Sequence, residues 1–135
     1  AGLFDKKSAF LPVDDAFQFS AAKSDNQENV IVKWSIAEGY YLYQEKISVK
    51  LNQAETPSFD VPTFSISPED YNDPYFGLMK IFKKPVQAIF KASQPPLKAE
   101  DVIEIAYQGC TSGFCYPPEV KEIKVADNKS PGYRY

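Results

Sequence analysis

Histidine is absent from all 135 residues of this chain. Its absence excludes Cys-His and Ser-His-Asp nucleophilic catalysis and removes the commonest side-chain ligand of metal sites. Arginine is nearly absent as well, because Arg134 is the only arginine among the 15 basic residues, and arginine is the side chain best suited to phosphate groups. Together with a formal net charge of only −3, these absences argue against a nucleic-acid or membrane-surface partner.

Long apolar runs are missing too, since no stretch approaches the roughly 18 apolar residues that cross a bilayer. The portion shown is therefore expected to be soluble. The start of the chain, residues 1–7, lacks the basic and apolar regions of a signal peptide. Residues 127–135 have the polar composition of a linker, and a plain disordered tail fits them equally well. The length then predicts one domain over residues 1–126.

Alternation of apolar and polar residues predicts β-strands along most of the chain. Val30, Val32 and Trp34 would share the buried face of one strand. Further strands are expected over residues 16–20, 47–51, 86–90, 103–107 and 119–125. Eleven prolines and several polar turn clusters separate the runs, and 44% hydrophobic residues suffice for a packed core. About seven short strands without helical periodicity indicate an all-β fold, an immunoglobulin-like antiparallel β-sandwich.

Two segments concentrate aromatic residues. Residues 39–43 hold three tyrosines within four positions, which fits either ordinary strand packing or the lining of a site. Residues 71–77 place three aromatic side chains in a segment of loop composition. Aromatic residues in such a loop usually cover something, so the second segment is interpreted as a lid or a partner-binding surface.

The two cysteines, Cys110 and Cys115, lie within one short segment, residues 109–118. A structural disulfide is the ordinary interpretation of a cysteine pair in an exported domain. However, closing a ring of about six residues removes only roughly 2 kcal/mol of unfolded-chain entropy, against roughly 4.7 for a 100-residue loop. A chain this long can also build a core without a cross-link. The spacing favours thiol–disulfide exchange, in which the second thiol resolves the mixed disulfide that the first has formed.

The surroundings of the pair differ from those of common redox motifs. Pro117-Pro118 prevents a helix from continuing after Cys115, whereas a thioredoxin-like C-x-x-C opens a helix that lowers the thiol pKa. No lysine or arginine lies within residues 109–118. Two alternatives stay open: a binding or adhesion sandwich with an inert disulfide, and metal carriage by two thiolates, for which Met79 is the only other soft ligand.

These motifs together resemble the periplasmic N-terminal domain of DsbD, a family of bacterial thiol:disulfide interchange proteins. The resemblance runs from residues 2–5 through 15–19, 39–43 and 73–77 to the segment around the cysteines. Its most specific part is the block Tyr107-Gln108-Gly109-Cys110 followed by Gly113-Phe114-Cys115-Tyr116-Pro117-Pro118-Glu119.

The resemblance implies one domain of a protein-disulfide reductase in the inner membrane of a Gram-negative bacterium. Facing the periplasm, it would accept electrons from the thioredoxin-like C-terminal domain of the same protein. It would pass them to a periplasmic disulfide isomerase and to the thioredoxin-like protein of cytochrome c biogenesis. Residues 127–135 would link it to the membrane domain. We expect a monomer with no metal, no cofactor other than the disulfide, and no nucleic-acid partner.

The resemblance also implies roles for single residues. Cys115 matches the cysteine that forms the mixed disulfide with partners, and Cys110 matches the resolving cysteine. A cap loop that shields the pair, with Tyr75 lying over it, is matched by Asp73, Pro74, Tyr75, Phe76 and Gly77. The expected lining of the site consists of Tyr41, Tyr43, Phe114 and Tyr116.

Overall fold

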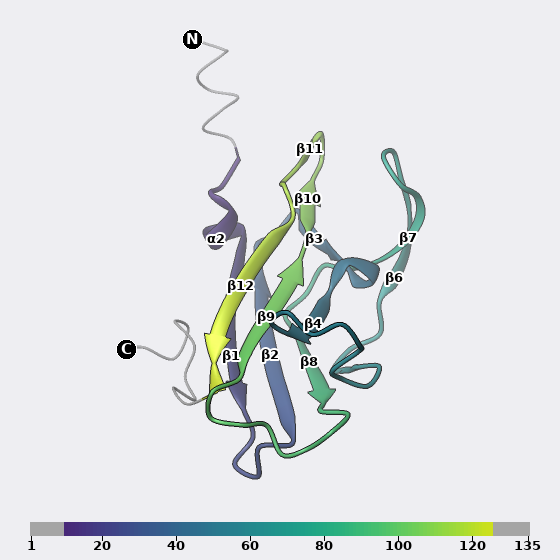
Figure 1. The fold of residues 1–135 in the computed structure, drawn as a ribbon. Helices are drawn as coiled ribbons and strands as arrows, with labels where there is room; N and C mark the ends of the chain where they lie inside the picture. Colours follow the sequence, from purple (N-terminus) through teal and green to yellow (C-terminus); the bar gives the residue numbers. More distant parts are fainter. Residues whose placement is uncertain (1–9, 126–135) are drawn as a thin grey trace.

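Residues 10–125 are described by the computed structural model, and antiparallel strands make up most of their fold (Figure 1). The first sheet runs in the order β1 (Phe17–Lys23), β2 (Asn29–Ile36), β8 (Val86–Lys91), β5 (Thr63–Phe64). The second runs β11 (Phe114–Cys115), β10 (Gly109–Thr111), β3 (Tyr40–Tyr43), β7 (Gly77–Phe82), β6 (Glu69–Asp73). The third runs β12 (Glu119–Lys124), β9 (Val102–Tyr107), β4 (Ser48–Leu51). The short helices are α2 (Val13–Ala16) and the 3₁₀ turn η1 (Gln44–Lys46).

The main core lies between the first and third sheets. It is the larger cluster of buried side chains, and includes Phe17, Val30, Val32, Trp34, Tyr40, Leu42, Val49, Ala88, Phe90, Ile103, Ile105, Tyr107, Tyr116 and Ile123. In Figure 1, β12, β9 and β4 cross in front of β1, β2 and β8, so the inner faces of two sheets meet as in a β-sandwich. The predicted all-β, immunoglobulin-like sandwich is confirmed.

The predicted alternation appears clearly in the strands that fill this core. On β2, Val30, Val32 and Trp34 are buried, while Lys33 and Ser35 between and beyond them are exposed. Strand β9 shows the same period of two. Both strands have one face against the opposite sheet and the other face outward. This arrangement produces alternating apolar and polar residues, so the strands can be predicted from the sequence.

Residues 71–77 depart from the expectation of an irregular loop. Strands β6 and β7 pair in register from Glu69 with Ile81 to Asp73 with Gly77, so residues 71–73 belong to a strand and only residues 74–76 form the turn of the β-hairpin. Gly77 occupies the left-handed region, with φ of 78°, which a glycine adopts without a steric cost. The hairpin extends on the same side of the molecule as the β10–β11 hairpin (Figure 1).

Residues 127–135, the expected linker, and residues 2–5 of the resemblance lie outside the described residues. Within residues 10–125, no helix is long and apolar enough to cross a membrane.

Candidate functional site: a dithiol under a hairpin cap

Cys110 and Cys115 form a disulfide across the β10–β11 hairpin, with an S–S distance of 2.07 Å and a Cα–Cα distance of 4.0 Å. The two residues are directly opposite each other in the strand register, and Thr111 faces Phe114 one step nearer the turn. Gly113 closes the turn in the left-handed region at φ 81°. The hairpin therefore holds both sulfur atoms on one face, as the two cysteines have the same strand orientation.

The two sulfur atoms differ in access. Cys110 is fully buried, at 0% exposure, because β10 pairs with β3 on its inner side. Cys115 lies on the edge strand β11 and is half-buried. A partner approaching from solvent therefore meets the sulfur of Cys115 first.

A second, smaller cluster of buried side chains surrounds the disulfide, and we call it the site cluster. Its members are Tyr41, Tyr43, Met79, Ile81 and Cys110, with Tyr71 and Cys115 packed against it. Strand β3 separates it from the main core: Tyr41 and Tyr43 face the disulfide, whereas Tyr40 and Leu42 face the main core. All four residues of β3 are consequently buried.

Gly109 fixes how closely the dithiol hairpin approaches the main core. A Cβ atom at this position would clash with the ring of Phe17, so only glycine leaves room for that ring. Phe17 in turn packs edge-on against Tyr40 and Tyr116. The glycine that precedes Cys110 thus anchors the hairpin to the sandwich.

Asp73 connects the cap to the disulfide. This carboxylate is 3% exposed, and its Oδ1 accepts hydrogen bonds from the backbone N–H groups of Tyr75 at 2.7 Å and Phe76 at 3.0 Å. Its Oδ2 accepts hydrogen bonds from the hydroxyl groups of Tyr43 and, at 3.3 Å, Tyr41. One oxygen therefore shapes the turn of the cap, and the other binds the cap to strand β3.

The Tyr43 hydroxyl also reaches the sulfur atoms. Its oxygen lies 3.0 Å from Cys110 Sγ and 3.6 Å from Cys115 Sγ. A disulfide sulfur carries no hydrogen, so in this oxidised state only Tyr43 could donate, and its single proton is shared with the Asp73 carboxylate. Tyr43 is therefore the polar link between carboxylate and disulfide.

Burial and hydrogen bonding keep these groups in defined charge states. Burial alone would raise the pKa of Asp73, but the hydrogen bonds from Tyr43, from two backbone N–H groups and from Tyr41 lower this pKa below its ordinary value. Burial raises the pKa of Tyr43 well above the ordinary tyrosine value, and its bond to Asp73 adds to the shift. Burial also raises the pKa of Tyr41, with the Tyr71 hydroxyl contributing. At neutral pH the site thus holds one carboxylate charge and protonated tyrosines.

Two aromatic residues form the tip of the cap. Phe76 packs edge-on against Tyr43 at a ring-centroid distance of 5.3 Å and stays 44% exposed. Tyr75 is 58% exposed. The two predicted tyrosines of β3 therefore lie beside the disulfide, and the predicted cap segment contacts Tyr43 through Asp73 and through the ring of Phe76 rather than that of Tyr75.

Phe114 and Tyr116 lie elsewhere. They flank Cys115 and point to the opposite face of the hairpin, where they pack against the main core and against each other at 4.8 Å. Phe114 also stacks on Phe10 at 4.9 Å, and the Tyr116 hydroxyl donates to the Leu11 carbonyl. The structure thus places these two residues behind the disulfide rather than around it, and burial raises the pKa of Tyr116 to about 12.

A comparison with known protein families decides which family this arrangement belongs to. The family model described as "Thiol:disulfide interchange protein DsbD, N-terminal" matches residues 7–127. The chain belongs to the DsbD N-terminal domain family.

Individual relatives agree with the family. DsbD of Haemophilus influenzae strain PittGG is 47% identical over 127 residues, covering 94% of this chain and 21% of the relative. DsbD of Pasteurella multocida is 39% identical over 91% of this chain and 20% of the relative. The chain therefore spans about a fifth of the length of the curated relatives that it matches.

Solved structures show the same fold. The reduced DsbD N-terminal domain of Neisseria meningitidis matches with a TM-score of 0.78 and 31% identity, over 90% of this chain and 93% of that one. The complex between the DsbD and PilB N-terminal domains of the same species gives a TM-score of 0.68 and 32% identity, over 86% and 87%. The N-terminal periplasmic domain of ScsB from Proteus mirabilis, at 15% identity and a TM-score of 0.55 over 90% and 51%, shares the fold alone.

Sequence reasoning missed parts of this DsbD-family site. The sequence motifs assign no role to Ile81 and mark Met79 only as a soft metal ligand, yet both residues belong to the site cluster. A signal was present, because Met79 and Ile81 alternate with the exposed Leu78 and Lys80 as in any half-buried strand. Among residues 10–125, no group of three or more His, Cys, Asp or Glu side chains is gathered as a metal site would require.

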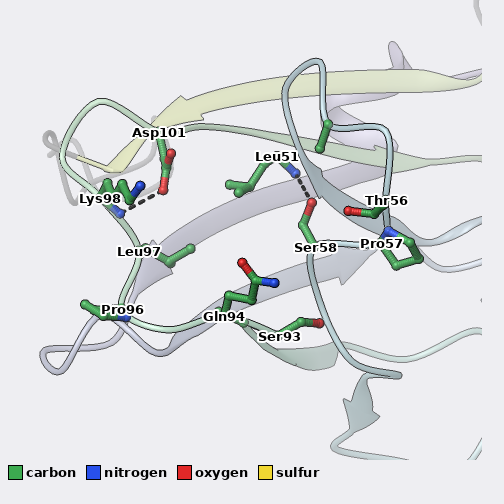
Figure 2. Close-up of a pocket in the computed structure, with 12 residues that line it drawn as sticks. Leu51, Thr56, Pro57, Ser58, Ser93, Gln94, Pro96, Leu97, Lys98 and Asp101 are labelled. Atoms are coloured by element: carbon green, nitrogen blue, oxygen red, sulfur yellow. Dashed lines mark hydrogen bonds between the residues drawn. The ribbon is translucent and has the colours of Figure 1, made fainter.

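A separate hollow of about 200 Å³ lies between the loops after β4 and β8 (Figure 2). Two of its polar side chains are bonded within the protein: Ser58 Oγ accepts the Leu51 N–H at 3.1 Å, and the Asp101 carboxylate accepts the Lys98 N–H at 2.7 Å. The hollow contains neither cysteine and is far along the sandwich from the β10–β11 hairpin (Figure 1). We therefore assign the chemistry to the dithiol.

Proposed function

We propose that this domain is a thiol–disulfide exchange module of a protein-disulfide reductase anchored in the inner membrane. It accepts electrons from a thioredoxin-like domain of the same protein and passes them to periplasmic partners, namely a disulfide isomerase and a thioredoxin-like protein of cytochrome c biogenesis. The observation that carries the proposal is a disulfide enclosed by the site cluster and placed 3.0 Å from the Tyr43 hydroxyl, which donates to a buried carboxylate. A disulfide serving stability alone needs neither feature.

The exposure of the sulfur atoms supports a division of roles. In the reduced domain, the Cys115 thiolate attacks a partner disulfide, forms a mixed disulfide and releases one partner thiolate. The Cys110 thiolate then attacks Cys115 Sγ, which re-forms the Cys110–Cys115 bond and releases the second partner thiolate. Two electrons pass to the partner in each cycle. Cys115 makes the first attack because it is half-buried on an edge strand, whereas Cys110 is fully enclosed.

Tyr43 and Asp73 control the proton in this scheme. Because the Tyr43 proton is committed to the Asp73 carboxylate, the oxygen lone pairs of Tyr43 face the sulfur atoms. On reduction, a Cys110 S–H can donate to that oxygen and complete a chain from thiol to hydroxyl to carboxylate. The chain stabilises the protonated form of the resolving thiol, Cys110.

The family relatives provide further support for the kind of partner. A DsbD N-terminal domain forms a complex with the PilB N-terminal domain in Neisseria meningitidis. We propose that partners of this chain dock over the face that carries Cys115 and the turn 73–77, which displaces the turn and exposes Cys115.

Trapping tests the proposal. We expect Cys110→Ala, reduced and then mixed with the oxidised thioredoxin-like domain of the parent protein, to accumulate a mixed disulfide on non-reducing gels, because the resolving thiol is missing. Cys115→Ala is the matched control, and it should accumulate none. Equal trapping by the two variants, or trapping by Cys115→Ala alone, contradicts the assigned roles.

A redox titration separates exchange from a structural disulfide. Structural disulfides of secreted proteins lie below about −300 mV, and exchange-active disulfides lie higher. We expect the Cys110–Cys115 pair to equilibrate with a glutathione or dithiothreitol buffer above that limit. A potential below it would support a binding or adhesion sandwich with an inert disulfide.

A further inference from the structure

Lys46 contacts the cap from an element outside the site cluster. It is the last residue of η1 (Gln44–Lys46), which directly follows β3 and therefore Tyr43. Its Nζ lies over the ring of Phe76, 4.8 Å from the ring centroid. The same ring meets the edge of Tyr43 at 5.3 Å. Phe76 thus has two contacts that come from adjacent parts of the chain.

A second contact joins η1 to the cap hairpin. The Glu45 carboxylate accepts the backbone N–H of Lys80, on strand β7, at 3.2 Å. The turn itself is held by a hydrogen bond from the Ile47 N–H to the Gln44 carbonyl at 3.1 Å. Lys46 therefore projects from a segment whose position relative to the hairpin is defined, rather than from a free loop.

We propose that Lys46 is a positioning residue for the exchange reaction, holding Phe76 against Tyr43 so that the cap stays over the disulfide. An ammonium group over an aromatic ring contributes about 0.5–1 kcal/mol at exposed sites. The inference rests on the proposed function, because holding the cap closed matters only if the disulfide reacts. It concerns access to the disulfide, not the chemistry of either sulfur atom.

A competing role for Lys46 predicts the opposite sign. Thiolates are the attacking species in disulfide reduction, and a nearby positive charge attracts them. If Lys46 acted in this way, removing its charge would slow reduction. If Lys46 holds the cap closed, removing its charge speeds reduction, because the cap opens more often.

The experiment measures how fast dithiothreitol reduces the oxidised domain. In this reaction the Cys110–Cys115 bond breaks, the cyclic disulfide of dithiothreitol forms, and two electrons move to the protein; acid quenching and alkylation count the free thiols. We expect Lys46→Met to react about two- to fivefold faster than the unmodified domain, the factor that a lost exposed cation–π contact represents. Lys46→Arg keeps a cation over the ring and should restore the original rate.

Lys80→Met is the matched control for loss of a charge. Lys80 lies on the same hairpin and pairs with Asp70 at 2.5 Å. We expect dithiothreitol to reduce the Lys80→Met variant as fast as the unmodified domain. Lys46→Met added to Phe76→Leu should give no further acceleration, because the ring that Lys46 contacts is already gone. Thermal unfolding of each variant checks that the fold is kept.

Unchanged or slower reduction of Lys46→Met overturns the proposal, as does equal acceleration by Lys80→Met. Acceleration that persists in the Phe76→Leu background overturns it as well. The assay uses only a small reductant, so its result is independent of the partner assignment. If the domain fails to trap partners but Lys46→Met still speeds reduction, the role of Lys46 stands and the proposed function is contradicted.

Discussion

The main core and the site cluster meet on opposite faces of strand β3 and differ in what they contain. Toward the main core, Tyr40 and Leu42 join aliphatic and aromatic side chains from two sheets. Toward the site cluster, Tyr41 and Tyr43 meet a disulfide, and their hydroxyl groups bind a buried carboxylate. Because side chains alternate along β3, the residues on one face contribute to the stable core and those on the other face line the disulfide.

The two regions also differ in how they are stabilised. Each large side chain buried in the main core contributes about 1.5–3 kcal/mol by leaving water. The site cluster depends more on hydrogen bonds, and those to a charged group contribute about 1.5–3 kcal/mol each. Substitutions on the two faces of β3 should consequently separate loss of stability from change of reactivity.

The largest expected effect is on the main-core side. Leu42 is fully buried there, at 0% exposure, so Leu42→Ala should lower the free energy of unfolding by about 2–5 kcal/mol. The rate of disulfide reduction by dithiothreitol in the folded protein should stay unchanged. Urea unfolding and the thiol assay measure the two quantities, and a reduction rate that rises with the stability loss would show that the two faces are coupled.

The adjacent residue should behave differently. Tyr43→Phe keeps the ring but removes the hydroxyl that joins Asp73 to the sulfur atoms. We expect a loss of about 1.5–3 kcal/mol in unfolding free energy together with faster reduction, because the cap loses its link to β3. Tyr41→Phe is the matched control, since its hydroxyl bonds Asp73 at a longer 3.3 Å. A Tyr43→Phe variant with an unaltered reduction rate would remove Tyr43 from the control of access.

Much of this comparison could be predicted from the sequence, because half-buried strands leave a pattern. The buried face of β2 was predicted from Val30, Val32 and Trp34, and that interpretation is confirmed. The cysteine spacing favoured an exchange pair within one short segment, and Cys110 is joined to Cys115 by a disulfide across β10–β11.

What could not be predicted depends on contacts distant in sequence. Strand β3 is buried on both faces, so its four residues show no alternation to read. The cap hairpin carries polar residues such as Glu69 and Asp70 on an edge strand, which hid its strands within an apparent loop. The position of Lys46 over Phe76 depends on how η1 packs against the β6–β7 hairpin, and no local sequence pattern predicts that packing.

Asp73 allows a test by pH. Burial alone would raise its pKa, but the hydrogen bonds from Tyr43, from the two backbone N–H groups of the turn and from Tyr41 together lower the pKa below the ordinary value. Because the pKa is lowered, the carboxylate makes its full contribution to stability at pH values above the unfolded-chain pKa of about 3.9. This contribution is lost as the pH falls through the pKa of the folded state. Asp73→Asn should cost about 1 kcal/mol at pH 7, since the amide oxygen still accepts the two backbone N–H bonds. Urea unfolding at pH 7 and below pH 3 should show the gap between the two proteins narrowing on acidification. A gap that stays constant would mean that the Asp73 charge does not stabilise the cap.

The smallest expected effect concerns Tyr75, which the family resemblance places over the disulfide. Its side chain is 58% exposed, whereas Phe76 beside it contacts Tyr43. Tyr75→Ala should therefore change the free energy of unfolding by no more than about 0.5 kcal/mol, as is usual at exposed positions. If Tyr75 still restricts access, the reduced domain should react about twofold faster with a small oxidant such as diamide, the factor that about 0.5 kcal/mol of lost cap contact represents. Phe76→Ala, measured beside it, should accelerate the reaction more, because it also removes the ring held by Tyr43 and Lys46. A larger effect from Tyr75→Ala than from Phe76→Ala would reverse this ranking and make Tyr75 the ring that covers the dithiol.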